Sequence, residues 1–229
     1  MSIKLYELTG DDDDRQFSPY CWRIRMALAH KGLAMTTVPW RFTEGDALKF
    51  AGATTVPVLV DGNKTLKDSW DIALYLDQAY PDRPKLFDSK QSVALALFFK
   101  QWAERSIPVM PVVIMDLFSH LHAKDKDYFR TSREKRFGKT LEEVGGNRPA
   151  ALAALRTALE PARQLLATQP FISGAAPGFA DHIFCGPFLF ARSMSPVQLL
   201  ETTDPVHAWR ERMLDLHNGM ARKAKGYPV

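Results

Sequence analysis

The sequence predicts an α/β domain with the element order β-α-β-α-β-β-α, followed by a domain made only of helices. Short β-like runs alternate with helical runs over residues 1–80, and helical periodicity dominates the rest of the chain. Pro81 and Pro84 separate the two parts, because two prolines so close together cannot continue a helix. We therefore expect a first domain at 1–80, a linker at 81–88 and a helical domain at 89–229.

The first domain begins with a βαβ unit. Its pattern predicts a strand at 2–8, a helix at 18–31 that ends at Gly32, and a second strand at 34–38. An irregular or helical stretch follows at 43–51. Two short strands joined by the turn dipeptide Asp61-Gly62 and a helix at 69–80 complete the domain.

The second domain is predicted to contain helices only. A long helix spans 89–122 and is broken or bent by Pro108 and Pro111. The remaining helices are expected at 125–143, 149–168, 179–193 and 204–223.

Composition restricts the class of protein. The chain has 229 residues, 46% of them hydrophobic, which suffices for a full core without disulfides. The formal charge is +4, but Lys and Arg are scattered among Asp and Glu, so we expect no nucleic-acid partner. No apolar run approaches the roughly 20 residues that cross a bilayer, so we expect no membrane partner either. The acidic run at Asp11–Asp14 is interpreted as a solvated loop, and no metal site is expected.

Cysteine usage indicates a reducing compartment. Cys21 and Cys185 lie far apart in the sequence, and the segment MSIKLYELTG lacks the features of a signal peptide. We therefore expect a cytoplasmic protein. Cys185 lies in an apolar helical run and is interpreted as core.

Ser18-Pro19 is a good helix start. A serine hydroxyl can accept from amides of the first turn, and proline suits the first helical position. The same geometry directs free N–H groups at whatever precedes the helix, which favours an anion or a thiolate there. SPYC also has the outline of a CxxC motif whose first cysteine is replaced by serine, so dithiol chemistry is excluded. Cys21 is interpreted as an inward-facing small hydrophobe in preference to a reactive thiol.

Two further segments have both a structural and a binding interpretation. Val56-Pro57 precedes an apolar strand and can be a turn with a cis peptide bond, beside which a ligand could pair with the N–H and C=O of Val56. Asp68-Ser69 precedes a helix, where Ser69 can cap and Asp68 could pair with an ammonium group. A turn would explain Val56-Pro57 equally well, and for Asp68-Ser69 taken alone a polar cap is the preferred interpretation.

Together these segments resemble the glutathione S-transferase superfamily over nearly the whole chain. KLYEL, SPYCWRIRMALAHKGL, TTVPVLVDG and LKDSWDIALYLDQAYP follow the order and spacing of its glutathione-binding, thioredoxin-like domain. FISGAAPGFADHIF is similar to the family's buried capping element, with its aspartate at Asp181 and Gly178 in place of the usual Ser or Thr cap. The segments SPYxWR, DYFRTSREKRFGKTLEEV and YPDRPKLF look most like a serine-type, bacterial β-etherase-related branch.

The resemblance implies roles for particular residues. Ser18 would face the sulfur of glutathione, with Tyr6 as the alternative. Val56 with Pro57 would hold the cysteinyl part, and the γ-glutamyl end would lie at Asp68 and Ser69. Many family members have Gln or Lys where this chain has Thr55.

The expected function is a homodimeric glutathione transferase of the detoxification type, which activates the thiol for attack on a small apolar, aromatic electrophile. Glutathione-dependent ether cleavage or isomerisation, and non-catalytic binding of glutathione or another ligand, are the alternatives. Side chains suited to a flat apolar substrate are Trp40, Phe42, Met110 and Met115, together with Trp102 and Phe118. Any one of these residues could instead belong to the core.

Overall fold

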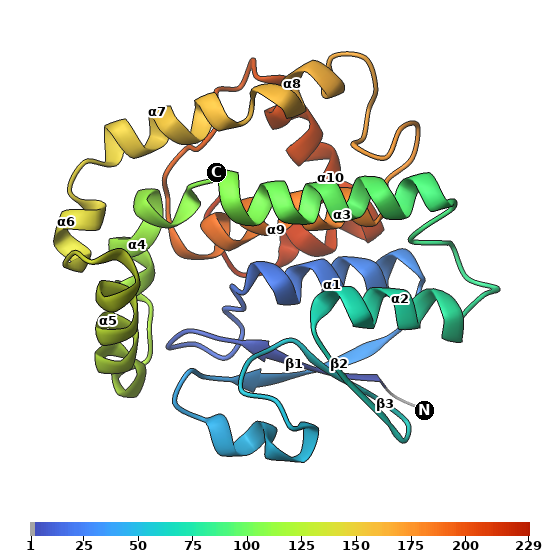
Figure 1. Ribbon diagram of the computed structural model, residues 1–229, viewed down its shortest axis with the longest axis horizontal. Coiled ribbons are helices and arrows are strands. Elements are labelled where there is room, and N and C mark those ends of the chain that lie inside the picture. The colour runs from blue at the N-terminus through green and yellow to red at the C-terminus, as the bar shows by residue number, and fades with distance from the viewer. Residues whose placement is uncertain (1–2) are drawn as a thin grey trace.

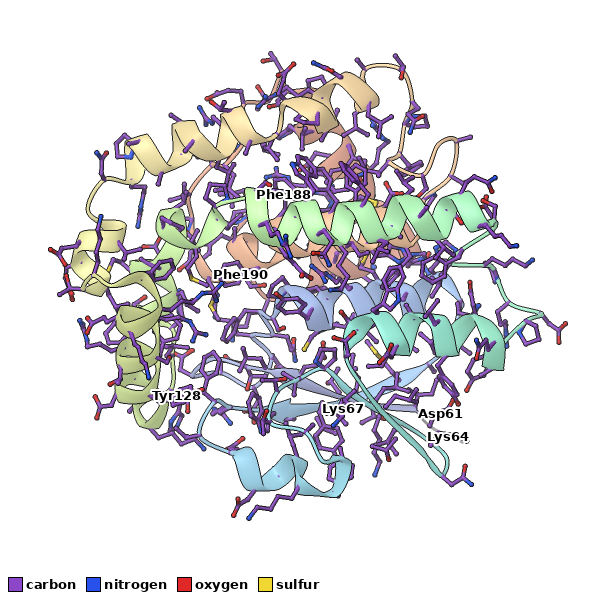
Figure 2. The ribbon with its side chains drawn as sticks, viewed as in Figure 1. Asp61, Lys64, Lys67, Tyr128, Phe188 and Phe190 are labelled. Carbon is purple, nitrogen blue, oxygen red and sulfur yellow. The ribbon has the colours of Figure 1, made fainter. Side chains whose placement is uncertain are left out.

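A four-stranded mixed sheet forms the centre of the N-terminal part of the computed structural model, which describes residues 3–229 (Figure 1). Its strands are β1 (Ile3–Leu8), β2 (Met35–Trp40), β3 (Val58–Asp61) and β4 (Lys64–Lys67), in the order β2-β1-β3-β4. β1 pairs parallel with β2 and antiparallel with β3, and β3 pairs antiparallel with β4. Figure 2 shows Asp61 and Lys64 side by side at the β3–β4 turn, where they are paired in the register. The predicted order of elements is confirmed, although residue 2 of the predicted first strand lies outside the described residues.

Helices α1 (Pro19–His30) and α2 (Ser69–Ala79) lie on the face of the sheet that is turned toward the C-terminal helices (Figure 1). The 3-10 helix η1 (Gly45–Ala51) lies on the other face. β1 contributes side chains to both faces of the sheet, because successive side chains of a strand point to opposite faces. Leu5 and Glu7 are fully buried under α1, whereas the ring of Tyr6 contacts Phe50 of η1 at a centroid distance of 5.3 Å.

The C-terminal part is entirely helical, as predicted. Its helices are α3 (Lys90–Ser106), α4 (Val109–Ser119), α5 (Ala123–Phe137), α6 (Leu141–Gly145), α7 (Arg148–Ala158), α8 (Glu160–Leu166), α9 (Phe179–Met194) and α10 (Pro205–Lys223). The long predicted helix is broken at Pro108, as expected. Within residues 3–229, no helix is both long and apolar enough to cross a membrane. The domain limits at 80 and 89 stay a prediction.

The single helices predicted at 125–143 and 149–168 are wrong, because each region forms two helices. Gly138 ends α5 in the left-handed conformation with φ 66°, and the Thr140 side chain then caps α6. Leu159 stands between α7 and α8, and α8 begins with a proline in its first turn.

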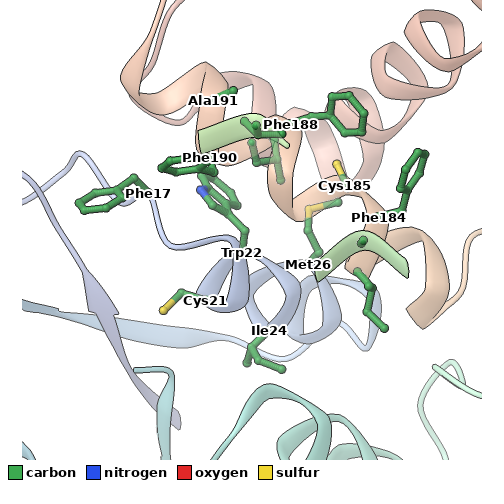
Figure 3. Packing of buried hydrophobic residues seen from close by; sticks show 14 of the residues in the cluster. Phe17, Cys21, Trp22, Ile24, Met26, Phe184, Cys185, Phe188, Phe190 and Ala191 are labelled. Atoms are coloured by element: carbon green, nitrogen blue, oxygen red, sulfur yellow. The ribbon is translucent and has the colours of Figure 1, made fainter. Parts of the chain in front are cut away.

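Helix α9 forms the centre of the core and packs against both α1 and α3. Figure 3 shows Trp22 and Met26 pointing from α1 toward α9, while Cys21 and Ile24 point toward the sheet. Gly186 lets α9 approach the first turn of α1, because a Cβ at this position would lie 2.6 Å from the carbonyl oxygen of Pro19. The first turns of α1 therefore pack against the sheet on one side and against α9 on the other.

The segment before α9 is held by the buried carboxylate of Asp181. It accepts hydrogen bonds from the backbone N–H groups of Ile172 at 2.7 Å and Gly178 at 3.1 Å, and from the indole N–H of Trp209 at 2.9 Å. A Cβ at position 178 would lie 2.6 Å from the Ser173 hydroxyl, so glycine avoids a steric conflict at the position where the resemblance implies a Ser or Thr cap. The capping element is preserved without its usual Ser or Thr.

Candidate functional site

Ser18 is the N-cap of α1. Its Oγ accepts a hydrogen bond from the backbone N–H of Cys21 at 3.3 Å, and Pro19 occupies the first helical position. The Ser18 hydroxyl donates to no nitrogen or oxygen of residues 3–229, and the buried thiol of Cys21 is a weak acceptor beside it. A hydroxyl can accept and donate at once, so capping leaves its proton free for a ligand.

Val56 supplies backbone groups beside this helix start. The Val56–Pro57 peptide bond is cis, as the sequence suggested, and β3 begins at the next residue. Neither the N–H nor the C=O of Val56 is hydrogen-bonded to another part of the described chain. Both groups are therefore available to an extended peptide-like ligand.

Asp68, not Ser69, is the N-cap of α2, which corrects the sequence interpretation. One carboxylate oxygen of Asp68 accepts from the backbone N–H of Trp70 at 2.7 Å, while the other has no partner within 3–229. Asp68 has φ 71°, a left-handed conformation that costs energy in a residue other than glycine and is concentrated at functional sites. Ser69 is buried as the first residue of α2, and its hydroxyl makes no hydrogen bond to the described residues.

The starts of α1 and α2 lie at the same end of the sheet, toward α4 and α5 (Figure 1). Burial raises the pKa of Tyr20, in the first turn of α1, and the negative charges of Glu104 and Asp68 add to this increase. The carboxylate of Asp68 therefore lies close enough to α1 to affect the pKa of Tyr20 in its first turn. A charge-assisted bond of 2.9 Å between Arg23 and Glu104 joins α1 to α3 beside this end.

A group of contacting aromatic rings begins at Phe17, the residue directly before Ser18. Phe17 contacts Phe42 at a ring-centroid distance of 6.2 Å, and Phe42 in turn contacts Tyr128 of α5 at 5.8 Å. Tyr128 is exposed, and Figure 2 shows it on the side of α5 that is turned toward the sheet. The guanidinium of Arg133 lies over the Phe42 ring at 5.5 Å. Phe17 is buried, so Phe42 and Tyr128 form the apolar surface that this group leaves accessible near the helix start.

A buried carboxylate holds α5 against the first domain. Asp125 accepts from the backbone N–H groups of Phe42 at 3.2 Å and Thr43 at 3.0 Å, and from the Thr43 hydroxyl at 2.7 Å. Because these donors follow β2, the position of Phe42 depends on α5. Lys124 and Glu44 form an ion pair that supports the same contact.

The predicted pocket residues fall into different environments. Phe42 belongs to the aromatic group next to Phe17. Trp40 is buried, and its indole N–H donates to the carbonyl of Glu44 at 2.8 Å. Trp40 therefore supports the loop that carries Phe42.

The predicted residues of α3 and α4 are less closely connected with the helix start. Met115 packs against Gly145 of α6. A Cβ added to Gly145 would lie 2.8 Å from the Cγ of Met115. Trp102 stacks on Phe184 of the core at 5.5 Å. Met110 is half-buried. A role for the methionines in substrate binding stays a prediction.

Neither Cys21 nor Cys185 resembles a reactive thiol. Both are free and buried, and burial raises the pKa of Cys21 to about 12 and moves that of Cys185 upward as well. Tyr6, the alternative to Ser18, directs its ring to the opposite face of the sheet, against Phe50.

Asp125, Tyr128 and Arg133 were missed by the sequence analysis. They belong to a strongly polar helix, and polar helices usually face solvent. The only available signal was that aromatic residues interrupt the charges, as Tyr128 and Phe129 do. That signal does not say which part of the first domain the helix contacts.

Comparisons with known proteins agree with this architecture. A family model described as glutathione S-transferase, C-terminal domain, matches residues 94–219, more than half of the chain. The corresponding model of the N-terminal domain matches residues 14–84. The chain belongs to the glutathione S-transferase family.

Individual relatives are found among plant and fungal proteins. Glutathione S-transferase Z1 from Arabidopsis thaliana is 42% identical over 69 residues, which cover 28% of this chain and 31% of the plant protein. The glutathione S-transferase-like protein ustS from Aspergillus flavus is 27% identical over 169 residues, which cover 69% of this chain and 57% of the fungal protein. The matches thus span between about a third and somewhat over half of these relatives.

Solved structures are similar over almost the whole chain. Glutathione transferase GSTFuA3 from Phanerochaete chrysosporium has a TM-score of 0.77 and 27% identity, covering 96% of this chain and 92% of that one. The glutathione S-transferase CsGST63524 from Ceriporiopsis subvermispora, solved in complex with glutathione, has a TM-score of 0.82 and 24% identity, covering 95% and 97%.

Proposed function

We propose that this protein is a serine-type glutathione transferase. It binds glutathione across the starts of α1 and α2, stabilises the thiolate with Ser18, and presents it to a small apolar, aromatic electrophile. The sulfur forms a new bond to the electrophilic carbon, and a leaving group departs with the electron pair of its own bond. In an addition reaction, a proton is taken up at the neighbouring atom instead.

One observation carries this proposal: polar groups without a partner gather at the end of the sheet where α1 and α2 begin. They are the hydroxyl protons of Ser18 and Ser69, the N–H and C=O of Val56, and the second carboxylate oxygen of Asp68. Glutathione is a peptide with a free ammonium group and a thiol, so it can use each of these groups. The ammonium would pair with Asp68, the cysteinyl backbone with Val56, and the sulfur with Ser18.

The helix start explains how the thiol would be activated. A hydroxyl that donates to sulfur favours the thiolate, and the positive end of α1 acts in the same direction. If donation from Ser18 contributes about 1.5–3 kcal/mol, it lowers the pKa of the thiol by about one to two units.

The apolar surface formed by Phe42 and Tyr128 supports an aromatic second substrate. Phe42 contacts the buried ring of Phe17, which directly precedes Ser18 in the chain, so a ring stacked on this surface would lie near the sulfur. Offset or edge-to-face contacts with aromatic rings stabilise such a substrate without specific hydrogen bonds.

The decisive experiment compares Ser18→Ala with the wild type and with Ser89→Ala. Ser89 is a matched control because it caps α3 through the N–H of Ser92 and lies away from the proposed sulfur site. We expect Ser18→Ala to retain glutathione binding in calorimetry, to raise the pKa of the bound thiol by about one to two units, and to lose most turnover at neutral pH with a chloronitrobenzene.

Other outcomes would select the alternatives. Wild-type protein that binds glutathione but turns over no electrophile would be a binding protein of this family. Cleavage of an aryl ether with release of the phenol, in preference to substitution on the chloroarene, would support the β-etherase-related function. Unchanged turnover in Ser18→Ala would make Ser18 only a cap.

We further propose a homodimer in the cytoplasm. Phe98 and Leu97 of α3 are 60% and 46% exposed, and large apolar side chains side by side on a helix surface are typical of a subunit interface. Two free cysteines suit a reducing compartment.

A further inference from the structure

Three histidine side chains from distant parts of the chain meet at the far end of α1 from Ser18. His30 is the last residue of α1, His182 lies in the first turns of α9, and His217 lies within α10. One ring nitrogen from each comes within 4.8 Å of the others. The ring centroids of His30 and His182 are 5.3 Å apart, and those of His30 and His217 are 6.0 Å apart.

Four of the six ring nitrogens of this cluster are buried without a hydrogen-bond partner within residues 3–229, while His30 also has a hydrogen bond with the backbone of Lys85. His182 is fully buried, and neither its Nδ1 nor its Nε2 is paired with any residue of 3–229. Nδ1 of His30 and Nε2 of His217 are also buried without a partner. Buried polar atoms are nearly always satisfied, and each exception needs an explanation such as a bound ion or water.

The backbone of α10 is bent where it carries the third histidine. His217 and Asn218 have φ angles of 53° and 60°, and Gly219 has φ 69°, so three successive residues are left-handed within a helix. Left-handed residues other than glycine are strained and persist where surrounding contacts hold them. Nε2 of His217 has no hydrogen-bond partner within residues 3–229 that would account for this conformation.

We propose that His30, His182 and His217 bind a first-row divalent metal ion, with Zn²⁺ as the principal candidate. Neutral imidazoles are good ligands for zinc, and three of them with a water in the fourth position form a common tetrahedral set. The water would complete the coordination, because His30 and His217 are only half-buried and leave the site accessible.

The electrostatic surroundings keep the rings in the form that binds metal. Burial, together with the neighbouring His30 and His217, moves the pKa of His182 well below its ordinary value. Burial also lowers the pKa of His30 and of His217. Coordination requires the neutral imidazole, which is the form that burial favours.

Binding requires only a small contraction of the cluster. Nitrogens that share a tetrahedral zinc ion at about 2.0–2.1 Å lie about 3.3 Å from each other. The present separations, up to 4.8 Å, can close by rotation of the two half-buried rings. His182, packed on all sides in α9, would remain fixed.

The bound ion would cross-link the first domain to the helical domain. It joins the end of α1 to α9 and α10, and it lies about 18 Å along α1 from Ser18. The ion would therefore stabilise the packing of the helical domain on the first domain and would not take part in thiol chemistry.

The test uses protein purified without a histidine tag, stripped with a chelator and titrated with Zn²⁺ against a chromophoric competitor. We expect one Zn²⁺ per chain, and a loss of affinity of about 100-fold or more in His30→Ala and in His217→Ala. His207→Ala is the matched control, because it lies on α10 outside the cluster, and it should bind as the wild type does.

Cobalt provides a second measurement that does not depend on stability. Co²⁺ bound to the wild type should show the intense visible absorption of a tetrahedral nitrogen site, and both cluster variants should lack it. Zn²⁺ should also raise the thermal midpoint of the wild type and of His207→Ala.

Two results would overturn the proposal. One is the absence of saturable binding of one Zn²⁺ per chain at micromolar concentrations. The other is binding that neither cluster variant weakens, which would place the ion elsewhere, for instance at Asp11–Asp14. If His217→Ala fails to fold, His30→Ala and the cobalt spectrum decide the question.

Discussion

Glu7 offers a quantitative test of how the sheet packs under the helix that carries Ser18. Its carboxyl group is fully buried, and neither oxygen accepts a hydrogen bond from residues 3–229. Arg25 and Cys21 of α1 face it, with the Arg25 guanidinium 3.5 Å away. Arg25 is also engaged with Gln16 at 2.9 Å and with the ring of Trp22, so it compensates the buried carboxylate only in part.

The expected effect follows from the pKa of this carboxyl group. Burial raises the pKa of Glu7 from 4.5 to about 7, and Arg25 lowers it by less. Because the pKa is higher in the folded state, the associated stability is fully present below about pH 4.5 and is lost as the pH rises through about 7. A shift of this size makes the free energy of unfolding about 2 to 3 kcal/mol lower at pH 8 than at pH 5.

Glu7→Gln removes the titration and keeps the shape of the side chain. We expect urea unfolding curves at fixed protein concentration to show that the variant gains about 2 to 3 kcal/mol relative to the wild type between pH 5 and pH 8. Asp82→Asn, at an exposed position that forms no ion pair within residues 3–229, controls for the general effect of removing a carboxylate. A difference between Glu7→Gln and wild type that stays constant over this pH range would refute the buried, protonated carboxyl.

Four further substitutions test the site and its supports. Asp68→Asn preserves the cap and tolerates the positive φ, and loss of its charge should weaken glutathione binding about 5- to 100-fold in calorimetry, whereas an unchanged affinity would remove Asp68 from the site. Asp125→Ala should lower the free energy of unfolding by about 1–3 kcal/mol in urea, while Asp127→Ala on the exposed face of the same helix should have little effect. Cys21→Ala should retain turnover within about twofold, because the thiol is buried and protonated, and severe loss in a folded variant would indicate a thiol mechanism. Phe98→Glu should convert the expected dimer to a monomer in light scattering, and a wild-type protein that is already monomeric at micromolar concentration would contradict the dimer.

The first domain was predictable because its signals are local. A serine followed by proline defines the start of α1, and Asp61-Gly62 defines the β3–β4 turn. In the helical domain the predicted helix at 125–143 continued through Gly138, because a single glycine within a polar run is compatible with a continuing helix. The structure shows it as the left-handed end of α5.

The proposed glutathione side and the proposed electrophile side of the candidate site also differ in how far local sequence signals predict them. The glutathione side consists of backbone groups and helix caps, whose position follows from the elements to which they belong, as for Ser18. The electrophile side depends on contacts between α5 and the loop after β2, which are set by the buried carboxylate of Asp125. Nothing in the sequence of that helix distinguishes Asp125 from Asp127, since both lie in one charged run. Asp125 holds the backbone of Phe42 against α5. Under the proposed function, substitutions in α5 would therefore alter the choice of electrophile while leaving the proposed glutathione side intact, so that one glutathione-binding domain could serve different second substrates.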